Sequence, residues 1–247
     1  MHNDVADLRE FYASGLGQVA RRLIATRIRA RWRTPGMGTL IGLGYAVPYL
    51  SSFRGEATRI GALMPVMQGA LVWPREGPKQ SVLVEDDDLP LADCSVDRLL
   101  VVHGLETAGS DTAMLRELWR VLAPDGRLLL VVPNRRGLWA RTDRTPFGHG
   151  RPYSRGQVET MLRAALFTPI EWSAALYVPP FSRDTLLKTA VAWERMGARV
   201  LPGFAGVIIV EATKELMAPL KVKRRIRVLP DLVPAGGRLA GAVRGEA

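Results

Sequence analysis

The part of the sequence that most constrains the fold runs from residue 96 to residue 132, where two apolar runs flank an amphipathic one. Val96 to Val102 ends in an apolar run, and Leu128 to Val132 is apolar at every position. Between them, Asp111 to Leu122 has helical spacing, and Pro124-Asp125-Gly126 is a turn signal. A short strand that is apolar throughout is typical of a parallel sheet covered on both faces. The stretch therefore predicts a strand, a helix and a parallel strand.

The rest of the chain continues this alternation. Further strands are predicted at Thr39–Gly42, Ala57–Ala62, Ser81–Val84, Pro169–Leu176 and Gly206–Ala212, and further helices at Asp7–Arg33 (one helix or two), after Pro48, at Ser154–Leu166 and at Phe181–Met196. Such alternation predicts an α/β fold, a Rossmann-like doubly wound sheet of seven strands. Ligands bind such sheets outside the carboxyl ends of the strands.

Three segments are expected along the 247 residues. Residues 1–35 are predicted to form an N-terminal amphipathic helical segment, with apolar positions on one face and arginines on the other. Residues 36–213 are predicted to form the α/β domain, and this length suits a single core. Residues 214–247 are basic, then rich in Gly, Ala and Pro, and are predicted to form a flexible basic tail.

The chain is basic, with a formal net charge of +10. An anionic partner would fit this charge: an acidic protein, a lipid headgroup or a nucleic acid. The compact run Lys221–Arg227 and the arginine face of the first helix would make the contact. Few aromatic residues lie between the basic ones, so base stacking is not indicated. Solvated surface arginines and a free tail are the other interpretation of the same pattern.

Cysteine and histidine are scarce. Cys94 is the one cysteine, so neither an intrachain disulfide nor a cysteine-based metal site is expected, and the three histidines predict no metal site. The polar N-terminus does not resemble a secretory signal, and no apolar run is long enough to cross a bilayer. We therefore expect a cytoplasmic protein.

One motif identifies a family resemblance. The acidic cluster Glu85–Asp88 is followed by Leu89-Pro90 and then by Ser95-x-Asp97, which enters the strand that ends at Val102. Together with the helix, turn and strand after it, this motif resembles the class I S-adenosylmethionine-dependent methyltransferase domain of the type 11, quinone-methylase-like group. The resemblance implies a methyltransferase fold with S-adenosylmethionine as cofactor. It implies that Glu85 binds the adenine amino group and that the backbone N–H of Asp86 faces a ring nitrogen.

The glycine-rich turn of that family is altered here. Family members carry an acidic residue and three spaced glycines after the first strand, and the corresponding cofactor-binding residues are Gly42, Gly44 and Tyr45. The second and third glycines are replaced by Ala46 and Pro48. The family's ribose-binding carboxylate after the second strand is also missing, since Leu63-Met64-Pro65 stands there.

His103, at the end of the fourth predicted strand, is the candidate catalytic residue. The resemblance places it beside the cofactor's sulfonium and the substrate. A neutral imidazole there would take a proton from an acceptor hydroxyl or amine. A structural histidine that caps the strand end is the alternative. Phe147, His149 and Tyr153 lie in a loop that would close the substrate side, if it is not a plain surface loop.

Three functions follow from these features. The first is an S-adenosylmethionine-dependent methyltransferase acting on a small-molecule acceptor. The second is a catalytically inactive relative that serves as a scaffold or binding protein through its basic surface. The third is RNA methylation, ranked last because the sequence shows no separate RNA-binding module.

Overall fold

The computed structural model describes residues 4–33, 37–181 and 189–215. Residues 1–217 form one compact unit, and the second unit, residues 218–247, lies outside the described residues. The predicted run Lys221–Arg227, and most of the predicted tail, therefore also lie outside them. Among the described helices, none combines the length and the apolar character that crossing a membrane requires.

Seven strands form one sheet in the order β3-β2-β1-β4-β5-β7-β6. They are β1 (Met37–Gly44), β2 (Ala57–Pro65), β3 (Ser81–Val84), β4 (Val96–Val102), β5 (Leu122–Pro133), β6 (Phe167–Ala175) and β7 (Val207–Lys214). The first five strands run parallel, whereas β7 pairs antiparallel with both β5 and β6. The predicted seven-stranded, doubly wound α/β sheet is confirmed.

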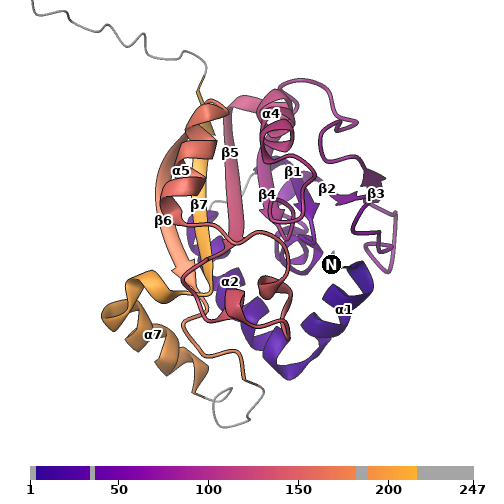
Figure 1. Ribbon diagram of the computed structural model, residues 1–247. Helices are drawn as coiled ribbons and strands as arrows, with labels where there is room; N and C mark the ends of the chain where they lie inside the picture. The colour runs from indigo at the N-terminus through magenta and orange to yellow at the C-terminus, as the bar shows by residue number, and fades with distance from the viewer. Residues whose placement is uncertain (1–3, 34–36, 182–188, 216–247) are drawn as a thin grey trace, which may run out of the picture. The chain divides into compact units, whose positions relative to one another are not determined.

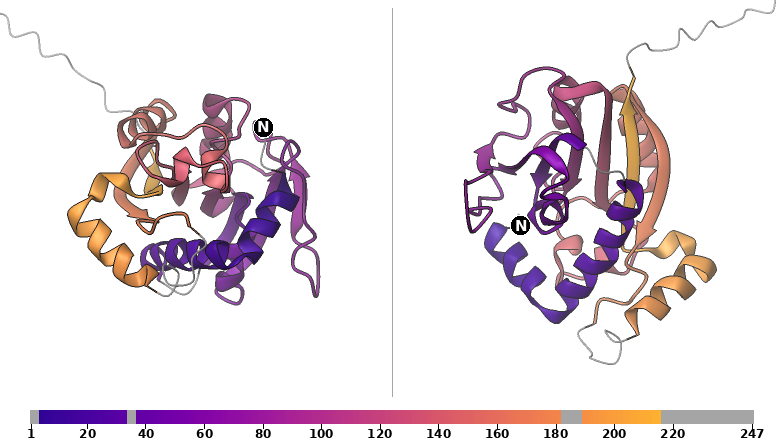
Figure 2. Two further views of the ribbon diagram at one scale, coloured as in Figure 1. Left: turned by 60° about the horizontal axis from the view of Figure 1, so that its bottom comes forward. Right: turned by 180° about the vertical axis from the view of Figure 1, so that it is seen from behind.

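Helices cover both faces of the sheet, as Figures 1 and 2 show. The N-terminal helices lie over one face and α4 and α5 over the other, while α7 lies beside the β6–β7 end (Figure 1). The helices are α1 (Val5–Ala13), α2 (Gly15–Arg31), α3 (Val47–Leu50), α4 (Asp111–Val121), α5 (Arg155–Ala164) and α7 (Ala190–Val200).

The alternation of β4 divides its side chains between two cores. Leu100 and Val102 pack with residues of α1, α2 and α3, whereas Leu99 and Val101 pack with residues of α4 and α5. All four side chains are fully buried. Covering on both faces is the physical reason why the central strands are apolar at successive positions.

Several element bounds differ from the predicted ones. The helical region predicted over Asp7–Arg33 is two helices, because Ser14 ends α1 and its side chain caps the start of α2. The predicted turn Pro124-Asp125-Gly126 lies inside β5, where the pairing with β4 shifts register between Val96 and Arg98. The helix predicted at Phe181–Met196 is described only as α7, since residues 182–188 lie outside the described residues.

Part of the basic surface is neutralised by the fold itself. On α2, Arg29 forms a two-pronged ion pair with Glu56, and Arg31 pairs with Glu171 of β6. Lys214 ends β7, where its Nζ donates to the carbonyl of Leu122 at 2.9 Å. Arg29 and Arg31 are thus neutralised within the chain, whereas Lys214 is buried. The predicted anionic partner stays a prediction.

Candidate functional site

Gly44 ends β1 in a conformation that only glycine adopts easily. Its φ is +79°, and a Cβ there would lie 2.4 Å from the carbonyl oxygen of Val102, at the end of β4. The next residue, Tyr45, donates its N–H to that same carbonyl at 2.7 Å. The turn therefore brings the carboxyl ends of β1 and β4 together, and the close approach of the backbone explains the glycine.

Gly42 lies inside β1 rather than in the turn. A Cβ at this position would lie 2.6 Å from the Cβ of Ala46 and 2.7 Å from Cδ1 of Leu50. Gly42 thus lets α3 pack closely against β1. Its predicted contact with a cofactor stays a prediction.

His103 follows β4 and is buried, with 1% of its surface exposed. Its φ of +50° is unusual for a residue with a side chain. Nδ1 lies 3.0 Å from Oε1 of Glu106, and Nε2 lies 2.9 Å from the hydroxyl of Tyr12. A carboxylate accepts hydrogen bonds only, so an ionised Glu106 places the imidazole proton on Nδ1. Nε2 is then the acceptor and the Tyr12 hydroxyl the donor.

Tyr12 belongs to α1 and is the residue that sequence reasoning missed. Its hydroxyl also lies 3.0 Å from that of Tyr49, on α3. Burial, reinforced by the neighbouring Tyr49, raises the pKa of Tyr12 well above its usual value, and burial likewise raises the pKa of Tyr49. Both phenols therefore stay protonated and can donate hydrogen bonds at neutral pH.

Aromatic rings enclose this cluster. The ring of Tyr45 stacks on that of Tyr12 with centroids 5.5 Å apart, and the ring of Phe147 lies 4.8 Å from that of His103. The loop residue Phe147 is thus beside His103, as a covering residue would be. His149 instead contacts the backbone oxygen of Asp143 and is not part of the cluster.

Two buried polar groups complete the surroundings of His103. The side-chain amide of Gln68 donates to the backbone oxygen of His103 at 2.7 Å. The backbone oxygen of Gln68 accepts from the N–H of Val5 at 2.8 Å. Oε2 of Glu106 is buried and has no hydrogen-bond partner among the described residues. Gln68 thereby ties the start of α1 to the end of β4.

Glu85 and Asp86 directly follow β3. Glu85 is exposed and forms an isolated bridge with Asp88. Asp86 is partly buried, and its Oδ2 accepts from the N–H of Gly109 at 3.3 Å. Burial raises the pKa of Asp86. Both residues stand at the carboxyl edge of the sheet, where they were predicted.

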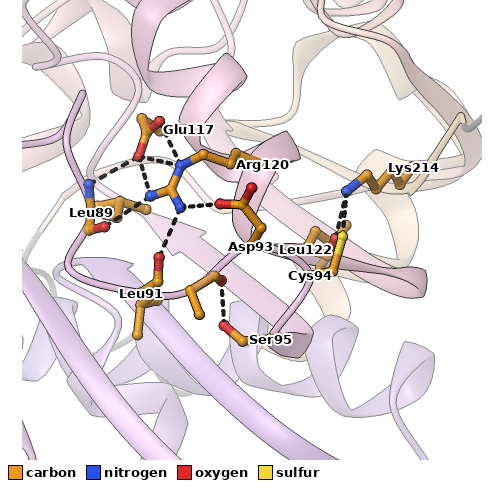
Figure 3. Close-up of polar contacts among 10 residues, drawn as sticks. Leu89, Leu91, Asp93, Cys94, Ser95, Glu117, Arg120, Leu122 and Lys214 are labelled. Atoms are coloured by element: carbon orange, nitrogen blue, oxygen red, sulfur yellow. Dashed lines mark hydrogen bonds and ion pairs between the residues drawn. The ribbon is translucent and has the colours of Figure 1, made fainter.

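The loop after them is held by Arg120 of α4, as Figure 3 shows. The guanidinium donates to the backbone oxygens of Leu89 and Leu91 at 2.9 and 2.8 Å and pairs with Glu117 and Asp93. Glu117 in turn accepts from the N–H of Leu89 at 3.0 Å. The Leu-Pro segment of the sequence motif is therefore bound to α4 by one arginine, which gives the motif a structural role.

Comparison with known proteins places this geometry in a family. Residues 42–130 match the sequence model of the methyltransferase domain family. The matched segment runs from β1 to β5. No curated protein matches the chain. The resemblance drawn from the acidic cluster and the strand after it is confirmed, because the matched residues include both.

Solved structures show the same fold at low sequence identity. A complex of the Haloferax volcanii Trm112 methyltransferase activator with a protein assigned as a methyltransferase gives a TM-score of 0.61 at 19% identity, covering 85% of this chain and 98% of that one. The [4+2]-cyclase SpnF gives 0.55 at 22% identity, covering 81% and 83%. The Burkholderia thailandensis 1,6-didemethyltoxoflavin-N1-methyltransferase, with bound S-adenosylhomocysteine, gives 0.50 at 16% identity, covering 81% and 78%.

S-adenosylmethionine is the cofactor that the match to the methyltransferase domain implies, and the Burkholderia thailandensis structure holds bound S-adenosylhomocysteine. At the adenine end Glu85 is exposed after β3 and Asp86 is partly buried, so neither position conflicts with the expected contacts, which stay a prediction. At the ribose end the residues fit the cofactor less well. No carboxylate follows β2 between Val66 and Gly69, and the one polar side chain there, Gln68, already binds His103.

The methionine end of the methyltransferase domain is filled by the chain's own groups. Ala46 is fully buried where the family has its second glycine, and the N–H of Tyr45 is already bound to Val102. The stacked rings of Tyr12 and Tyr45 lie beside this turn. The residues expected to contact the adenine are therefore present. The residues expected to contact the ribose and the methionine part of the cofactor differ from the family pattern.

Proposed function

We propose that the protein is an S-adenosylmethionine-dependent methyltransferase acting on a small-molecule acceptor. The observation that carries the proposal is the hydrogen-bonded chain from Tyr12 through His103 to Glu106, at the carboxyl end of β4. In this chain of hydrogen bonds, the buried Nε2 of His103 contacts the Tyr12 hydroxyl. The contact lies at the carboxyl ends of the strands, where α/β proteins bind ligands. When bound, the cofactor would supply an electrophilic methyl group.

In this proposal His103 is the general base. An acceptor hydroxyl or amine that approached Nε2 would transfer its proton there as the acceptor gains a methyl group. Glu106 would stabilise the resulting imidazolium, because its carboxylate already lies 3.0 Å from Nδ1. The cluster is buried away from water, so the pairing is stronger than it would be at the surface.

The acceptor would have to displace Tyr12. The hydroxyl of Tyr12 already donates its hydrogen bond to Nε2. The single lone pair of that nitrogen is therefore not free to take a proton from an acceptor. We therefore propose that α1 moves away from His103 when the acceptor enters. The hydrogen bond from Val5 to Gln68 and the stacking on Tyr45 are the contacts that this movement would break.

A catalytically inactive scaffold is the alternative function. The missing carboxylate after β2 and the buried Ala46 in the glycine turn favour it. A ribose without its usual charged acceptor would lose about 1.5–3 kcal/mol of binding free energy. The same two features are compatible with an enzyme that holds the cofactor mainly by its adenine end.

Calorimetric titration of the whole chain with S-adenosylmethionine and S-adenosylhomocysteine separates the two functions. Micromolar binding, weakened by Glu85→Ala and unchanged by Asp87→Ala, would support the methyltransferase. Asp87 is a suitable control because it is an exposed carboxylate of the same turn. The absence of heat and of any thermal shift at millimolar ligand would reject it in favour of the scaffold.

A further inference from the structure

A cavity lies at the carboxyl ends of β5 and β6, on the face covered by α5. Its volume is about 600 Å³, which is within the usual range for small-molecule sites. The loop after β5, the first turn of α5, β6 and the segment before β7 form its walls. None of the His103 cluster lines it, so it is a separate candidate site.

The charged side chains that line this cavity are all positive. Arg136 comes from the loop after β5 and Arg155 from the start of α5. Among the described residues, no carboxylate lines the cavity and neither guanidinium has an ion-pair partner. The one acidic residue of α5, Glu159, is bound to Arg163 instead. Two uncompensated guanidinium groups at one cavity favour an anionic ligand.

The cavity also has an apolar wall. Trp172 and Ala174 of β6 and Ile208 of β7 line it. Arg155 lies over the Trp172 ring, with Cζ 4.7 Å from the ring centroid, which restricts where the guanidinium can lie. A guanidinium binds carboxylate or phosphate with two parallel hydrogen bonds, and an indole packs well against a flat ring.

We propose that this cavity binds a small molecule with an aromatic body and one carboxylate or phosphate group. The aromatic body lies against Ala174, Ile208 and the part of Trp172 that Arg155 leaves uncovered, and the oxyanion lies between Arg136 and Arg155. The inference concerns binding alone and does not depend on the proposed methyl transfer, because the cavity is separate from His103 and its test needs no cofactor.

Titration of the whole chain with benzoate and with phenyl phosphate tests this site, with benzyl alcohol as the neutral comparison. Arg136→Gln and Arg155→Gln should each raise the dissociation constant about tenfold or more, since each removes a charge-assisted hydrogen bond. Arg163→Gln is the matched control, because Arg163 is an exposed arginine of the same helix outside the cavity. All three substitutions are at exposed or rim positions and should leave the fold intact.

The outcomes are distinct. Binding of either anion, weakened at Arg136 and Arg155 and unchanged at Arg163, supports the site, and the more tightly bound probe identifies carboxylate or phosphate as the recognised group. The proposal is overturned if neither anion binds at millimolar concentration, if benzyl alcohol binds as tightly as benzoate, or if inorganic phosphate binds as tightly as phenyl phosphate. Equal weakening by Arg163→Gln would also overturn it.

Discussion

The hydroxyl of Tyr12 lies 2.9 Å from Nε2 of His103, although 91 residues separate them in sequence. This one contact joins the N-terminal helix to the carboxyl end of a central strand. It occupies the imidazole nitrogen that faces away from Glu106, and both residues are buried. The contact therefore bears on the stability of the domain and on access to the proposed base.

Removal of the Tyr12 hydroxyl should destabilise the domain. In Tyr12→Phe, Nε2 of His103 would be left buried without a partner, so we expect a loss of about 1–3 kcal/mol. Tyr49→Phe is the matched control, because the Tyr49 hydroxyl contacts Tyr12 and not His103. It should cost about 0.5–1.5 kcal/mol. Urea unfolding followed by circular dichroism measures both, and equal losses would contradict the assigned role of the contact.

Glu106→Gln should disturb the tautomer of His103. A carboxylate requires a proton on Nδ1, whereas an amide can accept from or donate to that nitrogen. Nitrogen NMR of the imidazole should show one dominant tautomer in the wild type and a mixture in the variant. Once an acceptor is known, the rate of methyl transfer should fall by up to about 10⁴-fold, because the variant loses the carboxylate that fixes the tautomer and stabilises the imidazolium. An unchanged rate would exclude Glu106 from that role.

Gly44→Ala should cost more stability than Gly55→Ala. Both glycines have positive φ, +79° and +91°, so each substitution pays about 1–2 kcal/mol for the backbone conformation. At Gly55 the added Cβ meets nothing within 4 Å, whereas at Gly44 it would lie 2.4 Å from the oxygen of Val102. The difference between the two variants, from thermal or urea unfolding, isolates the close approach of β1 and β4.

Glu117 should make stability fall at acid pH. Its hydrogen bond from Arg120 is the main cause that lowers its pKa, and the N–H of Leu89 adds to it. A carboxylate with a lowered pKa in the folded state contributes stability above its ordinary pKa and loses it as pH falls through the folded value. Glu117→Gln should thus cost about 1 kcal/mol at neutral pH and less below pH of about 4. Glu159→Gln, at an exposed ion pair, should change stability little. A Glu117→Gln cost that does not change with pH would refute this linkage.

The sequence predicts the sheet well because its strands carry local signals. Val96–Val102 and Ser81–Val84 have the bounds that the structure shows, since short apolar runs next to turn residues mark buried strands. His103 and Glu85 could also be placed, because both directly follow a strand. The break at Ser14 was within reach as well, since a serine before a glycine is a recognisable cap.

Contacts between distant segments could not be predicted in the same way. Nothing near Tyr12 in the sequence distinguishes it from the other apolar-face residues of α1, and its partners are 37 and 91 residues away. Gln68 likewise gives no local sign that its amide binds the backbone of His103. The cavity beside Trp172 combines residues of the loop after β5 with residues of α5, β6 and β7. Such groupings are decided by tertiary packing rather than by local pattern.

The strand order has a consequence for synthesis of the chain on the ribosome. β7 comes last in the described sequence, yet it lies between β5 and β6 in the sheet. The hydrogen-bonding edges of both neighbours therefore stay unpaired until Lys214 has left the ribosome. A nascent chain stalled before β7 would expose open sheet edges on β5 and β6, which makes it a substrate for chaperones or proteases.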